Sequence, residues 1–282
     1  MIFTASILSI ALAVGQVAVP QPGPVVSVPV EAVSLQPLVG TTLELGRGGY
    51  QGTLDITAYG AGLAAVEETT VDQYLMGITE VPASWPAETL AAQAVAARTY
   101  LAWTLFRGRS INGTKYDYDI CASQYCQVYR GPGDAAAEWA EAVSRTGGEI
   151  LVADGRPAQA LYSSSAGART RSVQDIWGGG GVPYLQAVDS PELEYTPYER
   201  WELAVSTEVF EHVFARGGYN FGARIDDVRL RSPGEGNGPE YVEVHTEQGV
   251  TSISATSFRA FFNVHGPDLY PGSMPATRPS GS

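Results

Sequence analysis

The sequence predicts an α+β fold in which mixed, mainly antiparallel hairpins surround one central alanine-rich helix. Two observations lead to this class. Short runs of alternating polarity come in pairs separated by turn residues, which is typical of hairpins rather than of a doubly wound parallel sheet. The helical patterns gather in the middle of the chain. We expect one folded domain over residues 38–270 of the 282-residue chain.

The first elements are strands over residues 41–45 and 54–59, bounded by glycines. A helix follows at Thr70, which has capping-box spacing to Gln73. Apolar side chains then recur at helical spacing to Ile78. We expect this helix to end near Glu80, because Pro82 disfavours a helical residue before it.

The second helix is predicted over residues 87–106, where strong helix formers run without Gly or Pro. Pro86 suits its start, and its many alanines make it slim enough to be buried in the centre of the fold. Arg98 lies in this apolar surrounding, so it needs an acidic or backbone partner.

The later elements are a helix from Asp134 to about Arg145 and a hairpin that turns at Asp154 and Gly155. A strand pair over residues 227–231 and 241–245 and a short helix over 256–262 close the fold. The segment between the hairpin and this strand pair is looser and carries no clear pattern.

The two ends of the chain have compositions of their own. Residues 1–19 contain an uncharged apolar run typical of a signal peptide or N-terminal anchor, although no Lys or Arg precedes it. Residues 20–37 are rich in Pro and Val and predict a semi-rigid linker. Residues 271–282 predict a disordered tail. We therefore expect an exported protein, secreted or held at the cell wall or membrane.

The charge balance and the cysteines exclude several classes of protein. With 17 Lys and Arg against 30 Asp and Glu, the net charge is −13, so nucleic acid is excluded as a partner. The two cysteines, Cys121 and Cys126, are too few for a disulfide framework or a four-cysteine zinc site. They could form a small-loop disulfide or supply two thiolates to a metal.

Glu80 is the first candidate for chemistry. A carboxylate at the C-terminal end of a helix, beside apolar Ile78, Val81 and Trp85, has its ionised form disfavoured. A raised pKa is what a general acid at a glycosidic bond requires. The alternative is a solvated glutamate at a helix end.

Several strings together resemble the SpoIID/LytB domain family of bacterial cell-wall proteins. The most specific is Ala91-Ala92-Gln93-Ala94-Val95-Ala96-Ala97-Arg98-Thr99-Tyr100. The others are Val71-Asp72-Gln73-Tyr74-Leu75, Glu80-Val81-Pro82, Asp119-Ile120-Cys121, Cys126-Gln127-Val128-Tyr129, Tyr162-Ser163-Ser164-Ser165 with Gly167, and Trp177-Gly178 with Pro183-Tyr184-Leu185. Their order and spacing match the family from about residue 40 to 265.

The resemblance implies a function. The family's sporulation member is a lytic transglycosylase that cleaves peptidoglycan glycan strands, and its catalytic glutamate corresponds to Glu80. Another member enhances a wall amidase, so the alternative is a non-catalytic wall-binding module with an amidase as partner. Gln93 and Arg98 are expected to hold the central helix and the Glu80 loop in place. The expected glycan contacts are Tyr125, Tyr129, Ser163, Ser165, Thr170 and Trp177.

The sequence departs from the family at two places. Some members bind zinc around the cysteines and have a histidine just before the second one, where this chain has Tyr125. We therefore favour a Cys121–Cys126 disulfide and expect neither a metal nor another cofactor. The second glycine after the serines is Ala168 here. A third interpretation, a hydrolase, would need a second carboxylate such as Asp119 or Asp175.

Overall fold

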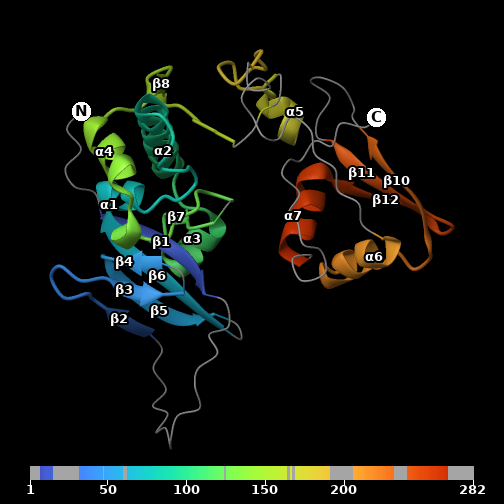
Figure 1. The fold of residues 1–282 in the computed structure, drawn as a ribbon, viewed down its shortest axis with the longest axis horizontal. Coiled ribbons are helices and arrows are strands. Elements are labelled where there is room, and N and C mark those ends of the chain that lie inside the picture. Colours follow the sequence, from blue (N-terminus) through green and yellow to red (C-terminus); the bar gives the residue numbers. More distant parts are fainter. Residues whose placement is uncertain are drawn as a thin grey trace, which may run out of the picture. The chain divides into compact units, whose positions relative to one another are not determined.

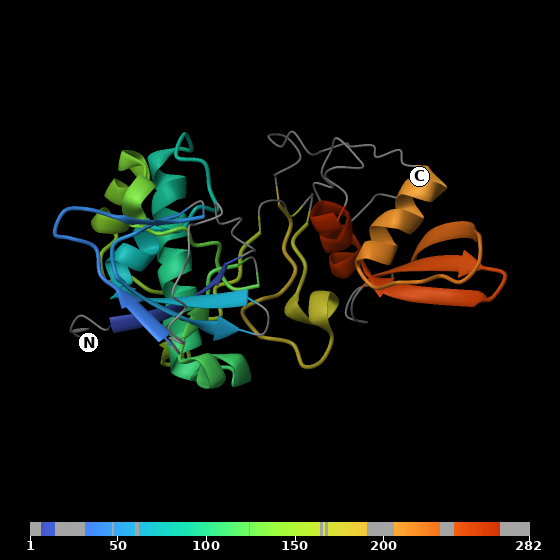
Figure 2. The ribbon, with the colours of Figure 1, turned by 90° about the horizontal axis from the view of Figure 1, so that it is seen from below.

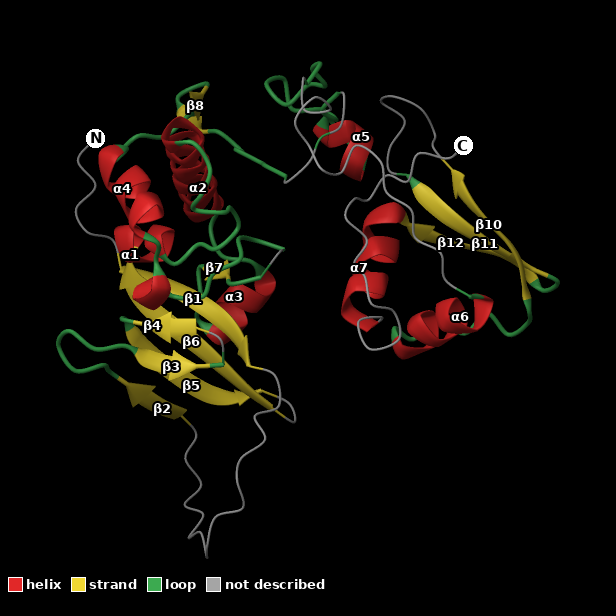
Figure 3. Ribbon diagram, in the orientation of Figure 1, coloured by secondary structure: helices red, strands yellow, loops and turns green. Residues whose placement is uncertain are grey.

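The structure is a computed structural model that describes residues 7–14, 32–46, 48–59, 62–123, 125–163, 166, 169–190, 206–231 and 240–265. For residues 7–14, 59 and 62 only the backbone is described. Helices and small, mainly antiparallel sheets confirm the α+β class (Figure 3). The chain divides between Tyr162 and Ser163 into two compact units, whereas the sequence suggested one domain over residues 38–270.

The first unit is built on a mixed five-stranded sheet in the order β2-β5-β6-β1-β7 (Figure 1). All neighbours in it are antiparallel except β1 and β7. Its strands are β1 (Ile7–Val14), β2 (Ala32–Leu35), β5 (Thr53–Tyr59), β6 (Gly62–Thr70) and β7 (Ile120–Cys121). Two small hairpins, β3 (Leu43–Leu45) with β4 (Gly48–Tyr50) and β8 (Val152–Ala153) with β9 (Arg156–Pro157), complete its strands among the described residues.

Strands β1 and β2 fall inside segments to which the sequence gave other roles. β1 lies within the predicted signal peptide or anchor, and β2 lies within the predicted linker and pairs with β5. Removal of the first residues from an exported chain stays a prediction. The rest of these two segments and the predicted tail over 271–282 lie outside the described residues.

The helices of the first unit are α1 (Val71–Met76), α2 (Ala87–Arg107), α3 (Ile111–Tyr116), the 3₁₀ turn η1 (Pro132–Asp134) and α4 (Ala137–Arg145). Helices α1, α2 and α4 lie together at one end of the sheet, whereas α3 lies beside β1 and β7 (Figure 1). The predicted capping box is confirmed, because Thr70 Oγ1 accepts from Gln73 N and the Gln73 side chain accepts from Thr70 N. α2 matches the predicted central helix to within one residue.

Helix α1 ends at Met76, earlier than the sequence predicted, because the chain turns to pair with another segment. Gly77 permits this turn: a Cβ there would lie 2.3 Å from Tyr129 Cε2 and 2.7 Å from the Gly131 carbonyl carbon. Gly77 O then accepts from Arg130 N at 2.9 Å, and Thr79 N donates to Val128 O at 3.0 Å. Tertiary pairing, rather than Pro82, ends this helix.

The core of the first unit forms where α1, α2 and α4 meet the sheet. Its fully buried side chains include Leu54, Tyr74, Leu75, Leu90, Ala94, Ala97, Leu101, Ile120 and Val143. The small α2 residues let the neighbouring elements approach closely, as expected from the alanine run.

Arg98 is buried in α2. It has backbone hydrogen-bond partners, one of the two kinds of partner that the sequence predicted. Its Nη2 donates to Val143 O at 2.9 Å, and its Nη1 donates to Glu149 O at 3.3 Å and to Thr146 Oγ1 at 3.2 Å. These acceptors lie at the C-terminal end of α4, where carbonyl groups lack helical partners. Arg98 therefore ties α4 to α2, and its described hydrogen bonds do not reach the Glu80 loop.

The second unit contains α5 (Val173–Trp177), α6 (Thr207–Arg216), β10 (Ile225–Arg231), β11 (Tyr241–Thr246), β12 (Gly249–Ser254) and α7 (Ala255–His265). The three strands form an antiparallel sheet, and α6 and α7 pack on each other beside it (Figure 2). Its core is a cluster of aromatic rings around the fully buried Phe214. None of the helices in the described parts of the chain is long and apolar enough to cross a membrane.

Candidate functional site

Glu80 follows the short bridge through which Ile78 pairs with Tyr129. The turn after α1 and the segment over residues 127–130 therefore fix its backbone together. Its half-buried carboxylate accepts a hydrogen bond from the Tyr162 hydroxyl and one from the Val128 backbone N–H. Tyr162 comes from the chain just after the β8–β9 hairpin, so residues 82 positions apart meet at this carboxylate.

Burial raises the pKa of the Glu80 carboxyl above its ordinary value, and the hydrogen bonds from Tyr162 and Val128 oppose this rise. The sequence predicted a raised pKa for the same residue, but it attributed part of the rise to the C-terminal end of a helix. α1 ends four residues earlier, and burial is the largest cause. The alternative of a fully solvated helix-end glutamate is wrong, because Glu80 is neither helix-terminal nor fully exposed.

The buried side-chain amide of Gln127 supports the Glu80–Tyr162 pair. Gln127 is 0% exposed, and its Oε1 accepts from the Tyr162 hydroxyl at 2.8 Å. Its Nε2 donates to Tyr74 Oη at 2.9 Å and to Ala97 O at 3.4 Å. The α1 and α2 helices thus hold Gln127, Gln127 holds Tyr162, and Tyr162 contacts Glu80.

Tyr129 was predicted to contact a glycan, and the structure corrects this. Its side chain is 3% exposed, its ring stacks on Tyr74 with centroids 5.1 Å apart, and its hydroxyl donates to Glu67 Oε2 at 2.6 Å. Glu67 is itself 0% exposed and accepts from Gly52 N at 2.8 Å and from Gln51 N at 3.2 Å. Tyr129 therefore belongs to the core beneath the Glu80 bridge and does not reach a ligand.

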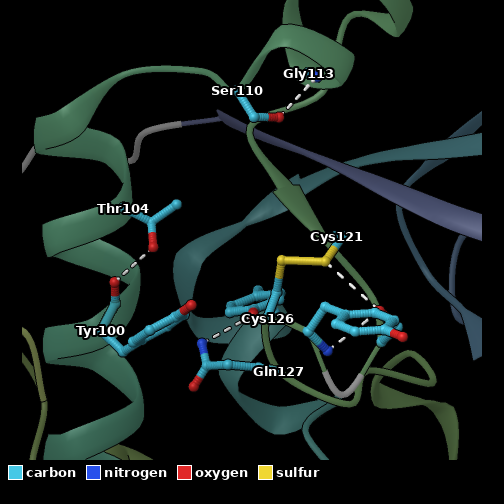
Figure 4. The surroundings of a disulfide bond; sticks show 10 residues. Tyr100, Thr104, Ser110, Gly113, Cys121, Cys126 and Gln127 are labelled. Carbon is cyan, nitrogen blue, oxygen red and sulfur yellow. Dashed lines mark hydrogen bonds between the residues drawn. A yellow bond between two sulfur atoms is a disulfide. The ribbon is translucent and has the colours of Figure 1, made fainter. Parts of the chain in front are cut away.

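Cys121 and Cys126 are joined by a disulfide bond with Cα atoms 5.6 Å apart (Figure 4). The bond closes the loop that leads directly into Gln127. In Figure 4 Gln127 and Tyr100 of α2 both lie beside it. A zinc ion does not fit these residues, because the disulfide uses both thiols and the exposed Tyr125 offers no imidazole.

The remaining predicted contacts lie in different parts of the molecule. Tyr125 is 82% exposed on the disulfide loop. Ser163, Thr170 and Trp177 belong to the second unit, where Trp177 is exposed at the end of α5 and Thr170 pairs with Val188. Ser165 lies outside the described residues. The glycan contacts of these residues stay predictions.

Three further residues were given candidate roles. Gln93 has a buried Nε2 that finds no hydrogen-bond partner among the described residues, so its support of the Glu80 loop stays a prediction. For a hydrolase, Asp119 and Asp175 were the candidate second carboxylates. Asp119 lies 2.7 Å from Arg109 in an ion pair, and buried Asp175 closes the capping box of α5 with Ser172. Both carboxylates thus have local structural partners.

Sequence reasoning missed Gln127, Glu67 and the role of Tyr162. Gln127 and Tyr162 stand inside the strings that carry the family resemblance, so their presence was visible although their function was not. Glu67 lies between the predicted strand over 54–59 and the predicted helix start at Thr70, where the sequence predicted no element. In the structure it belongs to β6, and its side chain is buried.

Part of the first unit matches a known protein family. Residues 59–152 match the family SpoIID, described as "Stage II sporulation protein". The matched segment contains Glu67, Glu80, the disulfide and Gln127, and it lies wholly within the first unit.

The chain is also similar to individual members and relatives of the SpoIID family. It is 27% identical over 157 residues to "Stage II sporulation protein D" of Bacillus subtilis, which covers 51% of this chain and 45% of that protein. It is 36% identical over 129 residues to the "Amidase enhancer" of the same organism, covering 46% of this chain and 16% of that protein. An uncharacterized protein of Brachyspira hyodysenteriae is 33% identical over 141 residues, covering 49% of this chain and 37% of that protein. The chain spans less than half the length of these curated relatives.

Proposed function

We propose that this protein acts on the bacterial cell wall as a peptidoglycan lytic transglycosylase, with Glu80 as its single general acid and base. Similarity to a stage II sporulation protein and to an amidase enhancer supports the wall-related role. The observation that carries the proposal is the Glu80 carboxyl. This group is half-buried, burial raises its pKa, and the Tyr162 hydroxyl contacts it. A carboxyl with a raised pKa keeps its proton to higher pH than an ordinary one and can deliver that proton to a leaving group.

The chemistry needs one carboxyl group rather than two. Protonated Glu80 gives its proton to the glycosidic oxygen between MurNAc and GlcNAc, and the bond from that oxygen to MurNAc C1 breaks. The ionised carboxylate then takes the proton of the MurNAc C6 hydroxyl, and the C6 oxygen bonds to C1. The product is a 1,6-anhydro end, no water enters the product, and Glu80 regains its proton.

The surroundings of Glu80 fit this use of a single carboxylate. Paired glycosidase carboxylates lie roughly 5–9.5 Å apart across the scissile bond. The tyrosines 74, 100 and 162 are titratable side chains that interact with Glu80 in the described part of the chain. In the proposal the protein is exported to reach its substrate, and the exposed aromatics Tyr125 and Trp177 stack on sugar rings.

The proposal is tested with purified protein and glycan strands stripped of stem peptides. We expect anhydro-ended fragments from the wild type and none from Glu80→Gln. Glu88→Gln is a matched control, because Glu88 is an exposed carboxylate paired with Arg145 at the start of α2. Release of anhydro ends by Glu80→Gln at the wild-type rate would refute the role of Glu80.

The second candidate is a non-catalytic module that binds the wall and enhances an amidase. The 36% identity to an amidase enhancer favours it. In that case the protein binds glycan strands without releasing any product, and it stimulates a partner amidase equally well as Glu80→Gln. Product release that depends on Glu80 separates the two functions.

A further inference from the structure

The Tyr162 hydroxyl lies between two acceptors. It is within hydrogen-bond distance of Glu80 Oε2 on one side and 2.8 Å from Gln127 Oε1 on the other. A phenol carries one proton, so it can donate to only one of them at a time. The second contact must be made with Tyr162 as the acceptor, or it is not a hydrogen bond.

The orientation of the Gln127 amide decides which contact that is. Ala97 O is a carbonyl and can only accept, so the Gln127 atom that faces it at 3.4 Å must be the N–H₂ group. The same group faces Tyr74 Oη at 2.9 Å. The atom that faces Tyr162 is therefore the amide oxygen, which can only accept. Tyr162 satisfies this fully buried oxygen only by donating its proton to it.

The protonated and ionised states of Glu80 then differ in whether every one of these groups has a hydrogen-bond partner. When Glu80 is protonated, its O–H donates to Tyr162 Oη, Tyr162 donates to Gln127, and every group is satisfied. When Glu80 is ionised, the single Tyr162 proton can be donated to only one of its two neighbours. Tyr162 donates to the carboxylate and leaves the buried Gln127 oxygen without a donor, or it donates to Gln127 and turns its own oxygen toward the carboxylate. Each choice costs a buried hydrogen bond.

We propose that Gln127 is a positioning residue that, through Tyr162, favours the protonated form of Glu80, and that the Tyr162 proton turns from Gln127 to Glu80 when Glu80 ionises. Tyr162 donates no proton to substrate in this arrangement. Its hydroxyl only changes the acceptor to which it points.

The catalytic meaning of this arrangement rests on the proposed function. Before bond cleavage, Gln127 holds the Tyr162 proton and Glu80 is ready as the acid. After Glu80 has given its proton to the glycosidic oxygen, Tyr162 turns and stabilises the carboxylate. When the carboxylate takes the proton of the C6 hydroxyl, Tyr162 returns to Gln127. One carboxyl can thus serve as acid and then as base.

The other groups around Glu80 do not replace this control. Tyr74 on α1 and Tyr100 on α2 are the further titratable side chains that interact with it in the described structure, and burial raises the pKa of each phenol. Both therefore stay neutral over the range in which a carboxyl titrates. The Val128 backbone N–H donates to Glu80 and does not change with pH.

The test follows the titration of the Glu80 carboxyl itself by carbon-13 NMR of the full chain, with the signal assigned by its loss in Glu80→Gln. Gln127→Met removes the competing acceptor, so the Tyr162 proton stays with Glu80 and its pKa falls by about one unit, a tenfold change in the protonated fraction on the alkaline side. Tyr162→Phe removes the donor to the carboxylate, so the pKa rises.

The two shifts have opposite signs, and the double variant matches Tyr162→Phe alone, because Gln127 acts only through Tyr162. Tyr74→Phe is the matched control. It removes the other hydroxyl bound to Gln127 and leaves the Glu80 midpoint in place. A merely structural role of Gln127 would instead lower the stability of Gln127→Met and leave the Glu80 titration unchanged.

A Glu80 midpoint that is unchanged or raised in Gln127→Met overturns the proposal, as does a fall in Tyr162→Phe. If Gln127→Met does not fold, Gln127→Leu, which also lacks the acceptor, takes its place with the same expected fall. The NMR titration needs no turnover, so it also separates this proposal from the proposed function. Shifts of the expected signs in a protein that cleaves no glycan would refute the transglycosylase and keep the proton arrangement.

Discussion

The buried carboxylate Glu67 allows a sharp prediction about stability. Glu67 Oε1 accepts from Gly52 N and Gln51 N, and Oε2 accepts from the Tyr129 hydroxyl. Glu67→Ala leaves the buried Tyr129 hydroxyl without its acceptor and removes the acceptor of two part-buried N–H groups. The stranded hydroxyl alone lowers the free energy of unfolding by about 1–3 kcal/mol.

Glu67→Gln separates the charge from the contacts. The amide oxygen can accept from Gly52 and Gln51, and the amide N–H₂ can donate to Tyr129 Oη, so only the Tyr129 hydroxyl proton loses its acceptor. Burial raises the folded pKa of Glu67 above its unfolded value near 4.3. Its contribution to stability is therefore fully present below the unfolded pKa and is lost as pH rises through the folded pKa. At neutral pH the amide avoids this loss.

The assay is urea unfolding at pH 4 and at pH 7.5, followed by tryptophan fluorescence and circular dichroism. We expect Glu67→Gln to compare more favourably with the wild type at pH 7.5 than at pH 4, and Glu67→Ala to be the least stable protein at both values. If Glu67→Gln is as unstable as Glu67→Ala at pH 7.5, the charge of Glu67 is essential and the reasoning is wrong.

Three further variants test the supports of the site. Gly77→Ala places a Cβ 2.3 Å from the Tyr129 ring, so we expect a loss of roughly 1–3 kcal/mol in urea unfolding, whereas Gly180→Ala, which meets nothing within 4 Å, stays near the wild type. Arg98→Met strands the acceptors at the end of α4 and lowers the unfolding free energy by about 3 kcal/mol, while the Glu80 pKa measured by NMR stays unchanged. The unfolded, unreduced wild type shows no free thiol in a thiol assay, and Cys121→Ser with Cys126→Ser loses about 2 kcal/mol because the short loop is no longer closed. Two titrating thiols in the unreduced protein would contradict the disulfide.

The sequence predicts local structure well where one segment determines its own conformation. The capping box of Thr70 and Gln73 needs only neighbouring residues, and the α2 helix needs only an uninterrupted run of helix formers. The turn at Asp154 and Gly155 likewise follows from two residues that accept positive φ, and they adopt 49° and 74°.

What the sequence could not predict depends on distant segments. Helix α1 ends early because residues 128–131 come to lie against Gly77, about fifty positions away in the chain. Tyr129 looks like a sugar-stacking aromatic until the fold buries it on Glu67. Helix α6 was missed although its signals are local: Ser206 caps it, Phe210, Val213 and Phe214 share its buried face, and Gly217 follows its last residue.

The candidate site likewise has a part that depends on neighbouring residues and a part that depends on distant segments. Glu80 could be chosen because its Glu-x-Pro context is local and because the resemblance gives that motif a role. Its environment could not be predicted. Tyr162, which contacts Glu80, and Gln127, which contacts Tyr162, lie 82 and 47 positions further along the chain. Burial and hydrogen bonding between such residues set the pKa of Glu80, and neither can be read from spacing.

The central claim is that Glu80 cleaves glycan strands by internal attack of the C6 hydroxyl, without water. The most direct measurement is the mass of the fragments released from denuded strands in water labelled with oxygen-18. The account predicts anhydro ends that carry no label, released by the wild type and not by Glu80→Gln. Labelled reducing ends that depend on Glu80 would show hydrolysis and contradict it, and fragments released equally by Glu80→Gln would remove Glu80 from the reaction.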